Sequence, residues 1–328
     1  LPFWALTVYY SWKIFDKKEI YVKDCILIGF FSAVGFLSKY LFIYLLIAID
    51  LLFCYSIFIK KYKKFNYKYL IILGVFSILL IPHLVWLTNN DYTTIKYGIA
   101  RTGLEESIFL NHVTNPLIFL GKQIGILIPF IIMSLFLIKK LKFKIDPKDK
   151  KLLFLLFINF VPIILILLTS IFTGSKIRTM WMVPFYLFFG VLVVYIFQSQ
   201  INLKRLNKFI TTFLILFILS PLLYAYVSVT KKDKRTDYRG KEIANLIQIK
   251  WNKNFSNNIS IVVGNEWHAG NLSYHLKSRP IWFNEKIPKN LEYNVGAIYI
   301  TNKNSLENTC LGIFTSIEGL NVCMVGNK

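Results

Sequence analysis

Residues 25–59 read CILIGFFSAVGFLSKYLFIYLLIAIDLLFCYSIFI, an apolar run with few polar side chains. A helix needs about 20 apolar residues to cross the ~30 Å hydrocarbon core of a bilayer. The run is too long for one crossing, and basic segments flank it on both sides. A short turn near Ser38-Lys39-Tyr40 would divide it into two crossings, the first of them short. The alternative is one long, tilted helix.

The rest of the chain repeats this pattern. Of its 328 residues 55% are hydrophobic and 17% charged, whereas soluble domains carry about 25% charged residues. We therefore exclude a soluble globule and predict a polytopic α-helical membrane protein with about seven complete crossings and a partial first one. The partial crossing is 1–12, and the complete ones are 25–38, 40–59, 69–87, 116–138, 152–171, 179–198 and 209–229.

The distribution of basic residues predicts the orientation in the membrane. Segments 13–24, 60–68, 139–151 and 199–208 hold 19 Lys and Arg, against five in the segments of the opposite side. The positive-inside rule places the first set in the cytoplasm. The net charge of +22 then reflects topology and contact with anionic lipid headgroups, and we predict no nucleic-acid partner.

The chain changes character at Lys231, which divides it into a membrane domain (1–230) and a periplasmic α/β domain (231–328). Helical spacing covers 236–255 and 267–276, and strand patterns cover 259–263, 297–301 and 321–325. Cys310 and Cys323 lie in this domain, where an oxidising compartment permits a disulfide. Two free thiols are the alternative.

Five basic side chains stand where the chain is expected to reach the outer face. Lys39 lies at the predicted turn, and His83 lies near the end of segment 69–87. Arg101 belongs to the loop 88–115, and Lys176 and Arg178 share the turn 172–178. Such cations suit a phosphate group. The alternatives are a snorkelling lysine at 39, a polar interface residue at 83, and headgroup contacts at 176 and 178.

Two further features leave their roles open. Asp50 lies about ten residues into a crossing, where a carboxylate is a functional candidate or a protonated packing residue. In the outside domain Glu266, His268 and His275 could form a metal site or be structural polar residues, and the i,i+7 spacing of the histidines disfavours the metal. Walker A, G-x-S-x-G and H-E-x-x-H motifs are missing from the sequence.

Four stretches together resemble a known family. They are Gly35-Phe-Leu-Ser-Lys39-Tyr40, Pro82-His-Leu-Val-Trp86, Gly174-Ser-Lys-Ile-Arg-Thr-Met-Trp-Met-Val-Pro184 and Gly264-Asn-Glu-Trp-His-Ala-Gly-Asn-Leu-Ser-Tyr274. Their order and sidedness are similar to those of the bacterial relatives of the dolichyl-phosphate-mannose protein mannosyltransferases. This group includes the lipid A aminoarabinose transferase and the rhizobial galacturonosyltransferases of lipopolysaccharide.

The resemblance implies a GT-C fold in the bacterial inner membrane. Such an enzyme moves a sugar from a polyprenyl-phosphate donor to an envelope glycolipid, polysaccharide or protein at the outer face. Cationic residues hold the donor phosphate, for which Lys39, Lys176 and Arg178 are the main candidates and Arg101 and His83 the secondary ones. We identify no cofactor, although the family leaves a divalent metal open.

The resemblance also implies an acidic general base in the first outside loop. That loop is expected to lie before Leu1, so we name no catalytic residue and expect these 328 residues alone to be inactive. The alternative functions are a transporter or flippase of lipid-linked precursors and a non-catalytic assembly partner for them.

Overall fold

The computed structural model describes residues 1–17, 19–104, 108–139, 146, 148–231, 234, 237–284, 295–302 and 304–327. The chain divides into two compact units, Leu1–Pro221 and Leu222–Lys328, and the boundary falls within the long helix α9.

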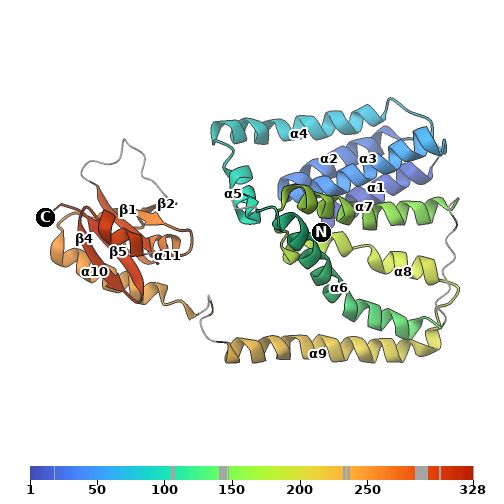
Figure 1. The fold of residues 1–328 in the computed structure, drawn as a ribbon. Helices are drawn as coiled ribbons and strands as arrows, with labels where there is room; N and C mark the ends of the chain where they lie inside the picture. Colours follow the sequence, from blue (N-terminus) through green and yellow to red (C-terminus); the bar gives the residue numbers. More distant parts are fainter. Residues whose placement is uncertain are drawn as a thin grey trace. The chain divides into compact units, whose positions relative to one another are not determined.

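The first unit is helical (Figure 1). In chain order its elements are α1 (Pro2–Asp16), α2 (Val22–Ser38), η1 (Tyr40–Phe42), α3 (Ile43–Cys54), η2 (Tyr55–Ile59), α4 (Tyr69–Asn89), α5 (Thr93–Thr102), α6 (Asn111–Leu137), α7 (Lys150–Thr173), η4 (Thr179–Tyr186), α8 (Phe189–Phe197), η5 (Leu203–Arg205) and α9 (Leu206–Thr230).

Five described helical segments are long and apolar enough to cross a membrane. They are Tyr40–Ile59, Tyr69–Asn89, Asn111–Leu137, Lys150–Thr173 and Leu203–Thr230. The bent pair η4 and α8, whose axes meet at 46°, makes a sixth if it is one span. Thus five predicted crossings have counterparts of sufficient length, but the predicted number of seven is not confirmed. The helices α1 and α2 have 15 and 17 residues, too few for about 30 Å of hydrocarbon when untilted.

A buried aromatic cluster forms the core of this unit. The Trp4 ring of α1 lies 5.4 Å from Phe42 and 5.0 Å from Phe185, measured between ring centroids. Farther along α1, Phe15 contacts Phe154 of α7 at 5.5 Å. Rings at these separations add to the stabilisation that burial of their area provides. The cluster therefore joins α1, α3, α7 and η4 although they are far apart in the sequence.

Lysines of the predicted cytoplasmic loops bind the ends of neighbouring helices. Lys63 Nζ donates to the carbonyls of Ile14 and Lys17, and Lys68 Nζ donates to that of Ile20 at 2.9 Å. The carbonyls of Ile14 and Lys17 lie at the C-terminal end of α1, where carbonyls lack intrahelical partners and carry partial negative charge. The Ile20 carbonyl lies in the connection before α2, so these contacts together stabilise the α1–α2 connection. Burial, together with nearby positive charge, lowers the pKa of Lys63. These lysines therefore have a structural role besides the predicted topological one.

The second unit contains a five-stranded sheet in the order β2-β1-β3-β5-β4. The strand β1 is parallel to β2 and β3, and β5 is antiparallel to β3 and β4. Both helices contribute buried side chains to one core with the sheet, in which Trp251 is the largest. The elements are α10 (Gly240–Asn254), β1 (Ile259–Gly264), α11 (His268–His275), β2 (Ile281–Phe283), β3 (Gly296–Thr301), η8 (Asn304–Thr309), β4 (Ile313–Ile317) and β5 (Leu320–Val325).

These elements agree closely with the predicted pattern of this unit. Thr236, where the first helix was expected to begin, lies outside the described residues. Strands β2 and β4 were not predicted. Strand β2 has only three residues, too few to show an alternation of apolar and polar side chains. Strand β4 pairs with β5 across Glu318-Gly319, both at positive φ, as two-residue hairpin loops require.

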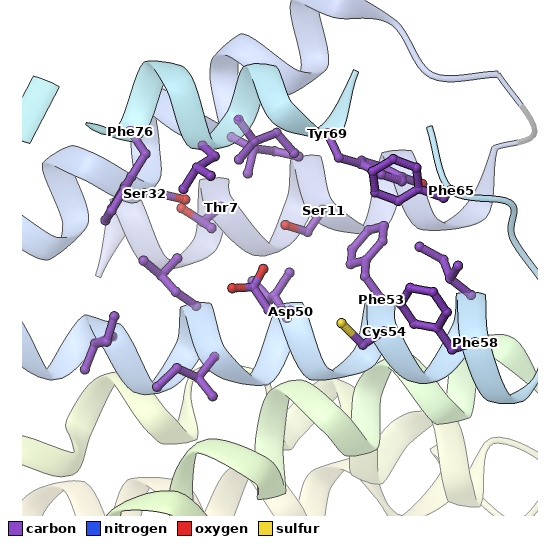
Figure 2. A pocket seen from close by; sticks show the side chains of 18 residues that line it. Thr7, Ser11, Ser32, Asp50, Phe53, Cys54, Phe58, Phe65, Tyr69 and Phe76 are labelled. Carbon is purple, nitrogen blue, oxygen red and sulfur yellow. The ribbon is translucent and has the colours of Figure 1, made fainter. Parts of the chain in front are cut away.

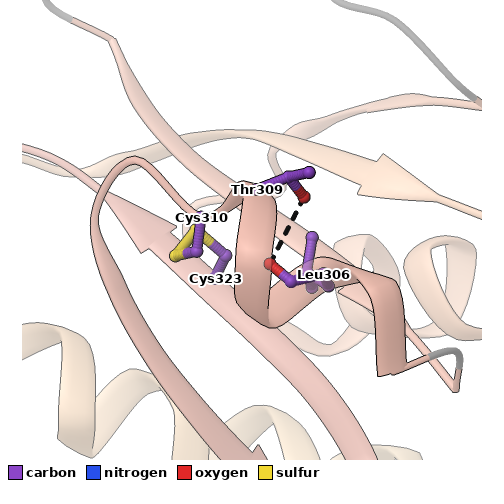
Figure 3. The surroundings of a disulfide bond; sticks show 4 residues. All are labelled: Leu306, Thr309, Cys310 and Cys323. Carbon is purple, nitrogen blue, oxygen red and sulfur yellow. Dashed lines mark hydrogen bonds between the residues drawn. A yellow bond between two sulfur atoms is a disulfide. The ribbon is translucent and has the colours of Figure 1, made fainter.

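Cys310 and Cys323 form a disulfide, with 5.6 Å between their Cα atoms (Figure 3). Cys323 lies in β5, and Cys310 precedes β4. The prediction of a bridge is confirmed. Closing a loop of this length restricts the unfolded chain and stabilises the unit by about 3 kcal/mol.

Replacing Cys310 and Cys323 together by Ser should lower the unfolding free energy of the second unit by about 3 kcal/mol. Hydrogen exchange at the amides of β4 and β5 in the whole protein measures this loss. The variant Cys54→Ala changes a free cysteine and should leave this exchange unchanged. Equal protection in the double variant and the native protein would contradict a stabilising bridge.

Candidate functional site

Lys39 breaks the long apolar run. Helix α2 ends at Ser38, and Lys39 is extended, with φ −163° and ψ 118°. Its amide still donates to the carbonyls of Gly35 and Phe36 at 3.1 Å, and its carbonyl accepts from Phe42 N at 2.9 Å. The next membrane-length helical segment begins at Tyr40. The predicted turn is confirmed, and the alternative of one long helix is wrong.

Gly35 permits this turn because it has no side chain. A Cβ atom at this position would stand 2.4 Å from a ring carbon of Phe42. That ring is 5% exposed and belongs to the aromatic core, so it has little room to move. The close approach of the Phe42 ring to the α2 backbone therefore requires glycine.

The ammonium group of Lys39 reaches a second turn of the chain. Its Nζ atom donates to the carbonyl of Trp181 at 3.1 Å, across 142 residues of sequence. The half-buried lysine lines a cavity of about 210 Å³ together with Trp4, Trp181 and Pro184. The walls are mainly apolar, so a cation lies beside a surface that an apolar chain can contact.

His83 joins the same region through Tyr40. The Tyr40 hydroxyl lies 2.8 Å from His83 Nε2 and 2.7 Å from Thr94 Oγ1. The His83 ring stacks on Trp86, with 5.9 Å between centroids. One phenol therefore holds α4 and α5 beside the turn at Lys39. In this structure the hydrogen-bond partner of His83 is the neutral Tyr40 hydroxyl and not an anionic group.

The turn 172–178 is held by polar contacts from three helices. Gly174 ends α7 at φ 68°, and its carbonyl accepts from Asn115 Nδ2 at 2.7 Å. The buried Ser170 donates to the carbonyl of Ser175 at 2.7 Å. The amide of Lys176 donates to the carbonyl of Thr102 at 2.9 Å. The backbone of this turn is therefore fixed, whereas the Lys176 side chain is exposed and Arg178 is half-buried.

Arg101 lies next to Thr102, in the last turn of α5. Its Nε atom donates to the Tyr97 hydroxyl at 2.8 Å, and its guanidinium lies 5.1 Å from the centre of that ring. Such a cation–π contact orients the arginine. The helix α5 was not predicted, because its ten residues are polar and apolar in similar measure.

A series of contacts thus links the segments of all five predicted phosphate-binding residues. His83 contacts Tyr40, the neighbour of Lys39, and Lys39 contacts Trp181, whose amide binds the Arg178 carbonyl at 3.0 Å. Lys176 is bonded through its backbone to the residue after Arg101. Among the residues that the structure describes, Lys39, Lys176 and Arg178 form no ion pair with a carboxylate. Their charges are available to an anion.

The described carboxylates of this region supply no evident general base. Asp91 is exposed at the end of α4. Glu105 and Glu106 lie outside the described residues. No group of three or more His, Cys, Asp and Glu side chains with metal-binding geometry occurs in the described part of the chain.

The histidines of the second unit have structural neighbours. His268 Nδ1 lies 3.3 Å from the Tyr238 hydroxyl, and burial lowers the pKa of this histidine. His275 packs close to Gly240, whose added Cβ would stand 3.0 Å from its ring. The described residues therefore do not support the alternative of a metal site at Glu266, His268 and His275.

Comparison with known proteins gives one match. Residues 1–86 match the family model described as dolichyl-phosphate-mannose-protein mannosyltransferase. This region includes the turn at Lys39, the neighbouring Tyr40, and His83, which the Tyr40 hydroxyl contacts. No curated protein and no solved structure matches the chain. The match supports the predicted resemblance to this family of membrane glycosyltransferases, and the bacterial subgroup stays a prediction.

Gly35→Ala should lower the unfolding free energy of the first unit by about 1–3 kcal/mol, because the new methyl group displaces the Phe42 ring. Thermal unfolding of the protein in a non-ionic detergent measures this change. Gly74→Ala is the matched control, since no atom lies within 4 Å of its added Cβ. It should be neutral or stabilise helix α4. Equal stability of the two variants would show that the contact does not constrain the turn.

Proposed function

We propose that this protein is a membrane glycosyltransferase of the GT-C type. It takes a sugar from a polyprenyl-phosphate carrier and transfers it to an envelope glycolipid, polysaccharide or protein. The family match over residues 1–86 supports the enzyme class. The observation that carries the proposal is the convergence of Lys39 with the segment of Arg178 through the bond to the Trp181 carbonyl.

The chemistry of the donor fits these residues. When the bond between sugar and phosphate breaks, negative charge increases on the departing polyprenyl phosphate. Cations already oriented toward that phosphate stabilise the transition state more than the ground state. Lys39 is held in place by the Trp181 carbonyl and lies beside an apolar cavity. We assign it to the donor phosphate, with its polyprenyl chain along the apolar wall.

Arg178 and Lys176 extend this phosphate site from a backbone that is already fixed. Arg178 can bind two phosphate oxygens at once through its guanidinium. Arg101, oriented by Tyr97, and His83, oriented by Tyr40, are secondary contacts to the donor. We name no general base among the described residues, and the acceptor and any divalent metal stay open.

The predicted topology places this site at the outer face of the bacterial inner membrane. The turn at Lys39 is on the side opposite to the lysine-rich segments, and the second unit is then periplasmic. A disulfide in the second unit agrees with an oxidising compartment. The partners on this proposal are the lipid-linked donor, the acceptor and membrane lipids.

In a protein that carries these residues together with the general base, Lys39→Ala and Arg178→Ala should each reduce sugar transfer from a polyprenyl-phosphate donor by about 10²–10³-fold, because each removes charge stabilisation from the leaving group. Turnover in membranes of equal protein content measures the loss. Lys96→Ala is the matched control, since this lysine is exposed on the same predicted side and lies outside the series of contacts. It should retain activity.

Unchanged turnover in Lys39→Ala would refute the assignment of the phosphate site. Movement of the lipid-linked substrate across the membrane, with no sugar transferred by the protein that also carries the general base, would favour a transporter or flippase. Loss of a protein complex with neither activity would favour an assembly partner.

A further inference from the structure

A second cavity lies among α1, α2, α3 and α4, and it shares no lining residue with the cavity at Lys39. Its volume is about 370 Å³. Most of its walls are apolar, with aromatic rings from Phe53, Phe58, Phe65 and Phe76 (Figure 2). One side chain in this lining, Asp50, is an acid, and no lysine, arginine or histidine lines the cavity.

Asp50 lies in the middle of a membrane-length segment. It is ten residues from the start of Tyr40–Ile59, about 15 Å along a helix. Its side chain is exposed to the cavity, and no hydrogen bond or ion pair involves it within the described part of the chain. A carboxylate at this depth is costly unless a cation or a proton neutralises it.

Two hydroxyl groups of α1 line the same cavity. The side chains of Thr7 and Ser11 are completely buried, and neither oxygen has a hydrogen-bond partner. Figure 2 shows both on one side of the cavity and Asp50 on the facing helix. A buried hydroxyl without a partner costs about 1–3 kcal/mol. The Tyr69 hydroxyl also lines this cavity without a partner, so four polar groups without partners belong to the lining of one apolar space.

We propose that this cavity binds an amphiphile that carries one ammonium group. The ammonium pairs with the Asp50 carboxylate and donates hydrogen bonds to Thr7 and Ser11. The apolar part of the ligand fills the space between the phenylalanine rings, whose faces also attract a cation. This binding site is additional to the proposed donor site.

The residues that line the cavity favour a lipophilic amine over a metal ion or an uncharged apolar molecule. A bare hard cation such as Mg²⁺ or Ca²⁺ requires six or more oxygen ligands, and apolar walls with a single carboxylate do not provide them. An uncharged apolar molecule would fill the volume but leave Asp50 without a counter-ion. A lipophilic amine satisfies both requirements, because it keeps an apolar body and needs one anion.

Binding of octylamine, which is an ammonium ion at pH 7, tests the proposal. The protein in a non-ionic detergent is titrated with octylamine and, separately, with octanol, and the rise in thermal unfolding temperature gives each affinity. Octylamine should bind the native protein more tightly than octanol. In Asp50→Asn it should bind about tenfold or more weakly, since the ion pair is lost.

Two further variants complete the test. Glu19→Gln removes an exposed carboxylate of the same unit and should bind octylamine like the native protein. Ser11→Ala removes a hydroxyl that has no partner, so it should fold without loss of stability and bind octylamine more weakly. This variant decides the question if Asp50→Asn does not fold.

Equal affinities for octylamine and octanol in the native protein would overturn the proposal, as would unchanged octylamine binding in both Asp50→Asn and Ser11→Ala. Either result would mean that the cavity accepts apolar chains without an ion pair. Sugar transfer plays no part in this measurement, so the outcome is independent of the proposed function.

Discussion

The bond from Lys39 to the carbonyl of Trp181 connects the two parts of the first unit that would hold a donor. A lysine in the middle of a 35-residue apolar run must reach either water or a polar partner. The chain meets this requirement by ending α2, turning, and directing the ammonium toward a second turn. The position of Arg178, the closeness of Phe42 to Gly35, and the Tyr40–His83 contact are all arranged around this break.

The same principle explains the lysines at the opposite, predicted cytoplasmic end. Lys63 binds a carbonyl at the C-terminal end of α1, where the backbone has acceptors without partners, and Lys68 binds the Ile20 carbonyl in the connection to α2. Lys13 pairs with the buried Asp24 at 2.6 Å. The lysines whose positive charge predicts the orientation of the chain in the membrane therefore also connect its helices.

The cavity at Asp50 differs from both arrangements. Elsewhere in the unit some buried polar groups have partners, as the Tyr186 hydroxyl has in Gln123 Oε1 at 2.6 Å. Others, such as Ser56 Oγ and Asn159 Oδ1, have none among the described residues. At the cavity the Asp50 carboxylate and three hydroxyls have none in the described residues. Unsatisfied polar groups reduce stability, and their concentration around one space suggests that a ligand supplies the missing partners.

The sequence by itself determined most of the elements, but not α5, β2 or β4. Apolar runs and the lysine at position 39 predicted the crossings and the turn, because the thickness of the bilayer and the cost of a buried charge act locally along the chain. Alternation predicted β1, β3 and β5, but neither the three-residue β2 nor β4. The tertiary structure alone decided which residues meet. Packing between distant segments brings Lys39 to Trp181 and Thr102 to Lys176. It also places Thr7 and Ser11 in the lining of the same cavity as Asp50. Spacing along one chain carries no signal for such contacts.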